Sequence, residues 1–201
     1  AKQFLVLLIF VITLFYCESV LSQSGDTLTN RARLVYQRDP QLAYEFSMRA
    51  VEKAHAESAQ QLLIKAYEIL GISLDYLGKL DSALFYFDKS IELIGHETDK
   101  SFLPRVYMSK ANSLFFLSKN KESLNYYLKA LEILKKTGQR KEESGCLMGI
   151  GNVYSSMKFY QLSLKYYDEA LIYFQEVNDL VIVSYLYTNI SEVYTSLEQI
   201  D

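Results

Sequence analysis

A string of ten residues recurs along this chain at intervals of 40 residues. "SALFYFDKSI" (82–91) returns as "ESLNYYLKAL" (122–131) and "LSLKYYDEAL" (162–171), with a fainter copy, "LAYEFSMRAV", at 42–51. A period between 20 and 50 residues is typical of solenoids, in which each unit buries its apolar face against its neighbours. The spacing therefore predicts a stack of similar units.

Small residues hold fixed positions in each period. Two of these columns lie seven residues apart with an aromatic residue four after the first, and these spacings place all three on one face of a helix. A third small column lies twelve residues earlier, on a preceding helix. The columns are Ala43, Ala83, Ser123 and Ser163; Ala50, Ser90, Ala130 and Ala170; and Gly71, Ala111, Gly151 and Ser191. Each period reads as a helix, a short turn and a second helix. Close helix packing requires small residues at the crossing, so we expect Gly71 to face Ala83, Ala111 to face Ser123 and Gly151 to face Ser163. The aromatic residues Phe87, Tyr127 and Tyr167 are expected to fill the space between hairpins.

Composition agrees with an all-α fold and sets limits on function. The 201 residues include only 8 glycines and 2 prolines, which suits long helices. The formal net charge of -3 gives no basic footprint, so nucleic acid is not an expected partner. The two cysteines, Cys17 and Cys146, are too few for a disulfide framework.

The first 22 residues have the pattern of a secretory signal peptide. Lys2 precedes the apolar run "FLVLLIFVITLFY" (4–16), and a more polar segment follows it. Val20 and Ser22 fit the cleavage site, which predicts a mature chain from Gln23 that is periplasmic or secreted. An uncleaved anchor is the alternative, although 13 apolar residues are short of the roughly 20 that a bilayer requires.

The segment "YEILGISLDYLGKLDSALFYFDKSI" (67–91) resembles the tetratricopeptide repeat, with its bulky residue, Leu–Gly pair, Ala, aromatic and small residue at fixed offsets. The departure is a period of 40 instead of 34 residues, and we expect the extra residues to lengthen the first helix of each unit. The resemblance implies a right-handed superhelix of antiparallel hairpins. The expected organisation is a signal peptide (1–22), a divergent repeat (24–63), three repeats (64–103, 104–143 and 144–183) and the first helix of a further repeat (184–201).

Candidate chemistry is sparse. "GIGNVY" (149–154) lacks the third glycine and the preceding strand of a dinucleotide fingerprint. His55 and His96 stand in different repeats without metal-ligand spacing, and Cys146 has no partner for redox chemistry. We therefore expect no catalytic residue, no cofactor and no metal, and a non-enzymatic chain.

The resemblance implies that the first helices line a concave groove that binds a protein or peptide. The expected groove residues are Lys65, Glu68, Ile72, Arg105, Met108, Asn112, Phe115, Met148, Asn152, Tyr185 and Glu192. Asparagine offers a donor and an acceptor to a peptide backbone, and methionine gives an adaptable apolar lining. The family's carboxylate-clamp pattern is incomplete, because Met108 and Met148 stand where a lysine is usual.

Two functional classes follow from the resemblance. The first is an exported adaptor or scaffold that binds a protein or peptide. The second is the extracytoplasmic sensory region of a membrane-bound signal-transduction protein. In that case a downstream membrane anchor and a histidine kinase or helix-turn-helix output domain would lie beyond residue 201.

Overall fold

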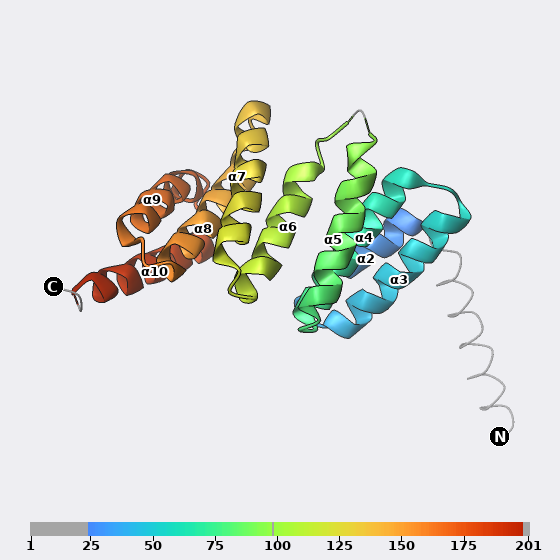
Figure 1. Cartoon of the computed structure of the whole chain (residues 1–201), viewed down its shortest axis with the longest axis horizontal. Coiled ribbons are helices and arrows are strands. Elements are labelled where there is room, and N and C mark those ends of the chain that lie inside the picture. Colours follow the sequence, from blue (N-terminus) through green and yellow to red (C-terminus); the bar gives the residue numbers. More distant parts are fainter. Residues whose placement is uncertain (1–23, 98, 199–201) are drawn as a thin grey trace, which may run out of the picture.

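The computed structural model describes residues 24–97 and 99–198. Over these residues the chain is helical, and consecutive helices are joined by short turns (Figure 1). The helices are α2 (Gly25–Val35), α3 (Pro40–Ala56), α4 (Gln60–Tyr76), α5 (Leu80–Gly95), α6 (Leu103–Phe116), α7 (Asn120–Thr137), α8 (Arg140–Ser156), α9 (Tyr160–Glu176) and α10 (Leu180–Glu198). The predicted signal peptide lies outside the described residues. None of the described helices combines the length and the apolar character that crossing a membrane requires.

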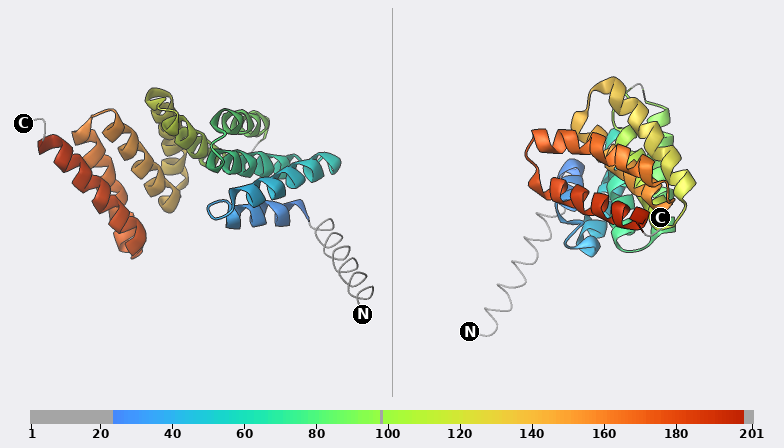
Figure 2. Two further views of the ribbon diagram at one scale, coloured as in Figure 1. Left: turned by 90° about the horizontal axis from the view of Figure 1, so that it is seen from below. Right: turned by 90° about the vertical axis from the view of Figure 1, so that its left-hand side faces the viewer.

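The helices form a stack of antiparallel pairs: α2 with α3, α4 with α5, α6 with α7, and α8 with α9, followed by α10. The first helix of each pair also contacts the first helix of the next, so that α2, α4, α6, α8 and α10 form a continuous inner layer. Figure 2 shows the resulting elongated, twisted stack from two further sides. The predicted all-α solenoid is thereby confirmed.

The turns recur with the same period as the helices. Within the hairpins, Gly78, Ser118 and Lys158 lie 40 residues apart and all adopt positive φ angles, of 73°, 59° and 63°. The residue after each of them donates its N–H to a carbonyl near the helix end, as Lys119 does to Leu114 at 2.9 Å. This left-handed cap satisfies carbonyls that the helix leaves unpaired. The same left-handed turn thus reverses the chain direction in each of these hairpins.

The start of the first helix varies among the repeats. α4, α8 and α10 begin at Gln60, Arg140 and Leu180, so the extra residues of the 40-residue period do lengthen these helices. α6 is different, because it begins only at Leu103 and Pro104 lies in its first turn. Proline has no N–H and its ring clashes with the carbonyl four residues earlier, so the helix does not extend upstream. The expected lengthening is therefore wrong for this repeat.

The small residues of all three predicted columns are buried in the four helix pairs. Ser191, on α10, lies outside these pairs and is exposed. Ala83, Ser123 and Ser163 are each 0% exposed. The Ser123 hydroxyl donates to the carbonyl of Ala111 at 2.8 Å, and that of Ser163 to the carbonyl of Gly151 at 2.9 Å. These hydrogen bonds join the two helices of α6–α7 and of α8–α9 at the predicted crossing points.

The aromatic residues pack differently from the expectation. Phe87 and Tyr167 lie on the glycine of their own hairpin, where a Cβ at Gly71 or Gly151 would come within 2.5 Å of the ring. Tyr127 alone of the three follows the prediction, because its ring covers Gly149 of the next hairpin at 2.3 Å from the Cβ position. Position 111 of its own hairpin is an alanine, whose methyl group occupies the space that the glycines leave to Phe87 and Tyr167.

The contact between the Tyr167 ring and Gly151 predicts that a larger residue at position 151 will lower stability. Gly151→Ala places a methyl group against Tyr167, and overpacking of this kind lowers the free energy of unfolding by about 1–3 kcal/mol. Gly145→Ala on the same helix is the matched control, because its Cβ would meet only Met108 Cε, at an ordinary 3.7 Å. Alanine there should raise helix stability by roughly 0.5–1 kcal/mol. Urea denaturation measures both, and equal effects would contradict the packing described.

Candidate functional site

The inner layer of helices encloses a groove of about 890 Å³. This volume lies within the range of roughly 300–1,000 Å³ that small-molecule and cofactor pockets occupy. The groove runs along α4, α6 and α8 to α10. Its lining residues are Gln37, Asp75, Tyr76, Gly78, Leu80, Asn112, Phe115, Phe116, Tyr127, Met148, Asn152 and Tyr185.

The groove brings together Asn112, Phe115, Met148, Asn152 and Tyr185, all of which the sequence proposed for it. They come from three successive first helices, α6, α8 and α10, and converge because the period repeats one helical face at each step. Side chains of this kind give an apolar and aromatic surface with a few polar groups, which is the usual character of a binding pocket.

The other predicted residues lie outside this lining. Ile72 and Met108 are half-buried against the apolar core. Lys65 is paired with Asp26 at 3.2 Å between Nζ and Oδ1. Glu192 lies on α10 and lines a separate open depression of about 590 Å³, formed by residues of that helix.

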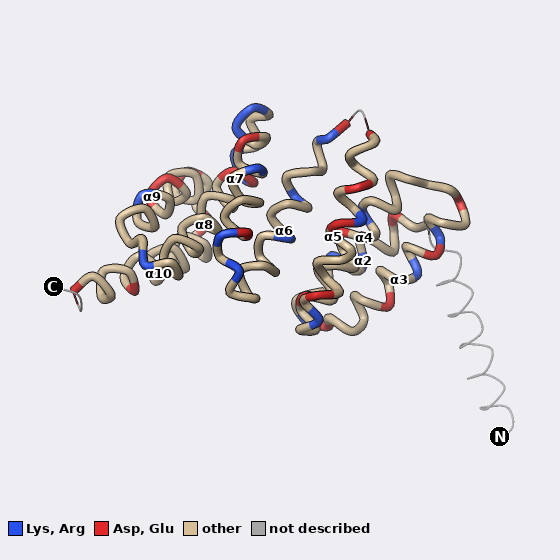
Figure 3. The backbone as a smooth tube through the Cα atoms, in the orientation of Figure 1, with Lys and Arg blue, Asp and Glu red and all other residues tan. Residues whose placement is uncertain are grey.

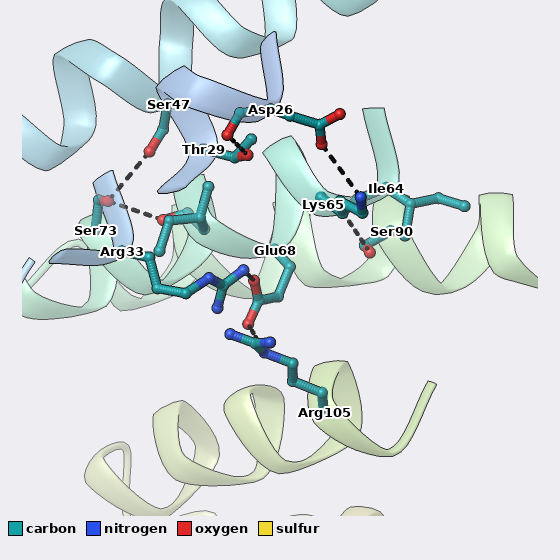
Figure 4. Close-up of polar contacts among 11 residues, drawn as sticks. Asp26, Thr29, Arg33, Ser47, Ile64, Lys65, Glu68, Ser73, Ser90 and Arg105 are labelled. Carbon is teal, nitrogen blue, oxygen red and sulfur yellow. Dashed lines mark hydrogen bonds and ion pairs between the residues drawn. The ribbon is translucent and has the colours of Figure 1, made fainter. Parts of the chain in front are cut away.

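The prediction that Glu68 contacts a ligand is contradicted by its burial. Its side chain is 0% exposed and lies between two guanidinium groups (Figure 4). Arg33 Nη2 lies 2.8 Å from Oε2, and Arg105 Nε lies 3.1 Å from Oε1. Burial raises the pKa of the Glu68 carboxyl, and the neighbouring Arg33 opposes that rise. Both arginines are therefore bound to Glu68, and together the three residues connect α2, α4 and α6.

The two predicted asparagines are already engaged within the fold. The Tyr127 hydroxyl donates to Asn112 Oδ1, and the Tyr167 hydroxyl donates to Asn152 Oδ1 at 2.7 Å. Asn189 Nδ2 also donates to Asn152 Oδ1, at 3.1 Å. The amide oxygens thus serve the tyrosines, and the amide N–H groups are left on the opposite side of each side chain. The oxygen of Asn152 accepts two hydrogen bonds and that of Asn112 accepts one, so the amide N–H groups are the main groups that the pair offers to a peptide.

Burial keeps the hydroxyl groups of Tyr127 and Tyr167 protonated, so that both act as hydrogen-bond donors. Desolvation raises the pKa of Tyr167 to about 12 and the pKa of Tyr127 further. Their hydroxyl groups therefore keep their protons at neutral pH. The second hairpin has apolar residues at the equivalent positions, Ile72 and Phe87, so the polar pair is replaced there as a unit.

Sequence reasoning missed several lining residues near the ends of the first helices, above all Asp75, Tyr76, Leu80 and Phe116. The signal was present in the period, because Asp75 lies 40 residues before Phe115, and Tyr76 lies 40 residues before Phe116. The column that contains Phe115 therefore identifies the positions. The residue type in this column changes from repeat to repeat, so the column shows no chemical pattern that would indicate a binding position.

The described residues contain no group of three or more histidine, cysteine or acidic side chains that could hold a metal ion. Cys146 is buried and its thiol donates to the carbonyl of Tyr127 at 3.2 Å. Burial raises the pKa of Cys146 to about 12, which keeps the thiol protonated. The His55 ring lies beside the Tyr67 hydroxyl at 3.2 Å. Figure 3 shows acidic and basic residues interspersed along the described helices.

Comparisons with known proteins agree with this geometry. A sequence profile of the tetratricopeptide repeat matches residues 64–96 and 104–137. The chain is similar in structure to a signal transduction ATPase with numerous domains from Pyrococcus horikoshii, which has a tetratricopeptide repeat sensor. The identity is 17% and the TM-score 0.72, over 85% of this chain and 27% of that one. A comparison with curated protein sequences found no match.

Two Rap proteins are similar in the same way. One is complexed with competence and sporulation factor, with 13% identity and a TM-score of 0.75 over 87% of this chain and 53% of that one. The other, the Rap conjugation gene regulator of plasmid pLS20, is in complex with the Phr* peptide. Its identity is 12% and its TM-score 0.63, over 86% of this chain and 58% of that one. The chain spans less than two thirds of each of these proteins, and the likeness establishes the superhelical fold that the sequence predicted.

The burial of the Glu68 carboxylate predicts that Glu→Gln will cost more stability at this position than at an exposed one. Glu68→Gln removes the charge that both guanidinium groups contact, and should lower the free energy of unfolding by about 1–3 kcal/mol. Glu132→Gln removes a carboxylate that is 69% exposed and pairs with Lys136, so no measurable change in the free energy of unfolding is expected. Urea denaturation of both variants provides the measurement, and similar losses would show that Glu68 stabilises no more than a surface pair does.

Proposed function

We propose that the chain, whose residues 64–96 and 104–137 match the tetratricopeptide repeat, binds an extended peptide segment of a partner protein in the groove. One observation carries the proposal. Five residues chosen from three repeats converge on a single groove whose lining is largely apolar and aromatic. A peptide crossing α4, α6, α8 and α10 would meet aromatic rings for its side chains and amide donors for its backbone.

The similar structures support a peptide or protein partner. One Rap protein is complexed with competence and sporulation factor, and the plasmid-encoded Rap regulator is in complex with the Phr* peptide. These ligands belong to those proteins, and what is transferred to this chain is the class of partner. The proposed role is that of a scaffold without enzymatic activity, because a fold of this kind presents an extended concave surface for binding.

We further propose that the protein acts outside the cytoplasm, on the strength of the apolar run at residues 4–16 and the small-residue exit after it. The alternative role, sensory input to a larger membrane-bound signalling protein, shares this location. It draws support from the signal transduction ATPase that carries a tetratricopeptide repeat sensor. Both roles use the same groove, and they differ in what lies beyond residue 201.

The groove proposal predicts which aromatic residues matter for binding. Phe116→Ala combined with Tyr185→Ala should weaken peptides selected on the wild-type protein by at least about tenfold, because aromatic anchors dominate interface energetics. The two side chains are 66% and 49% exposed, so the melting temperature should change little.

Fluorescence anisotropy with the selected peptides measures the change. Phe85→Ala, whose ring is 55% exposed and outside the groove lining, is the control for losing an exposed phenylalanine. Unchanged affinity in the double variant, or an equal loss in the control, would place the binding site elsewhere.

Export predicts a defined mature terminus. A signal peptidase that recognises Val20 and Ser22 would leave a chain that begins with Gln23. Mass spectrometry of the protein recovered from the native host's extracytoplasmic fraction should give that terminus. Recovery of residues 4–16 still attached, in the membrane fraction, would support the uncleaved anchor. Recovery of the uncleaved chain from the cytoplasm would refute export.

A further inference from the structure

Among the residues that line the groove, Asp75 is the one with a charged side chain. It lies in the last turn of α4, and its carboxylate is half-buried. The hydroxyl of Ser113, on α6, donates a hydrogen bond to Oδ1. The carboxylate is thus fixed in orientation by the neighbouring helix, and its second oxygen does not take part in that bond.

No basic group within 4 Å compensates this carboxylate among the described residues. The arginines of the inner layer, Arg33 and Arg105, are bound to Glu68, as Figure 4 shows. Glu68 precedes Asp75 by seven residues, which is about 10 Å along the helix. Burial raises the pKa of Asp75, as expected of an acid that lacks a cationic partner. A bound cation would offset this cost of burial.

Three aromatic residues line the same groove as Asp75. Tyr76 follows Asp75 directly on α4, and Phe115 and Phe116 follow Ser113 on α6 by two and three residues. All three rings line the groove together with Asp75. Aromatic faces attract cations, and a planar guanidinium can lie on a ring while it donates to a carboxylate. This combination of groups favours arginine over a neutral or acidic side chain.

We propose that the groove selects a peptide segment by one arginine side chain, which pairs with Asp75 and stacks on the rings of Tyr76, Phe115 and Phe116. The inference rests on the proposed peptide-binding function and specifies its ligand. The arginine enters near the ends of α4 and α6, and the flanking residues of the peptide extend along α8 to α10 over Met148, Asn152 and Tyr185.

The test uses the full chain and a panel of heptapeptides that are acetylated and amidated, so that terminal charges do not contribute. Each sequence is made with arginine, citrulline or glutamate at its centre. Citrulline keeps the shape of arginine and lacks its charge. We expect the arginine peptides to bind at least tenfold more tightly than their citrulline counterparts, and the glutamate peptides to bind most weakly.

Asp75→Asn should bring the ratio of the arginine and citrulline affinities close to one, because the charge that distinguishes the two side chains is removed. Asparagine keeps an oxygen that can accept from Ser113, so the variant should melt no lower than the wild type. Asp168→Asn, on the exposed surface of α9, changes the net charge equally and should retain the preference.

The outcomes separate the two proposals. Arginine and citrulline peptides that bind equally, and that Phe116→Ala with Tyr185→Ala weakens, would overturn the arginine selection and leave peptide binding intact. A preference for arginine that survives Asp75→Asn would also overturn it. Failure of every peptide to bind would overturn both.

Discussion

The whole stack depends on aromatic rings that lie directly on glycines of a facing helix. Phe87 covers Gly71, Tyr167 covers Gly151, and Tyr127 reaches the next hairpin to cover Gly149. Because no Cβ separates ring from backbone at these glycines, the facing helices approach closely. The same rings carry the hydroxyl groups that donate to Asn112 and Asn152. Tyr127 also lines the groove, so the contact that holds two hairpins together forms part of the binding surface.

The periodicity was enough to predict the fold and part of the lining of the candidate groove. A strict 40-residue spacing determines which residues share a face, and for this reason the small columns are buried and Asn112, Met148 and Asn152 line one groove. Their role in binding stays a prediction. Glu68 was misplaced for a physical reason. Its position on α4 faces the groove, but Arg33 and Arg105 cover it, and they come from helices 35 and 37 residues away. The contact depends on two arginines that do not recur in the other repeats. A periodic sequence pattern therefore does not reveal it.

The ion pairs of Glu68 also determine which charged groups of the inner layer are paired and which are not. Glu68 binds both neighbouring arginines, so neither guanidinium is free to pair with Asp75. Two turns further along α4, Asp75 is oriented by a hydroxyl and lacks a basic partner among the described residues. The stabilising cluster and the groove carboxylate are therefore linked, because an unpaired Arg105 would be an internal competitor for any cation that approaches Asp75.

Selectivity within the groove follows from which positions vary between repeats. Asn112 and Asn152 recur at one position and are oriented identically by tyrosines, so they offer the same amide donors to a backbone of any sequence. Asp75 replaces Phe115 and Ser155 at its own position of the repeat, and introduces a charge where the others have a ring and a hydroxyl. A residue that recurs in successive repeats, as Asn112 and Asn152 do, can hold a peptide in register, whereas a residue found in one repeat, such as Asp75, can distinguish one side chain of the peptide from the next.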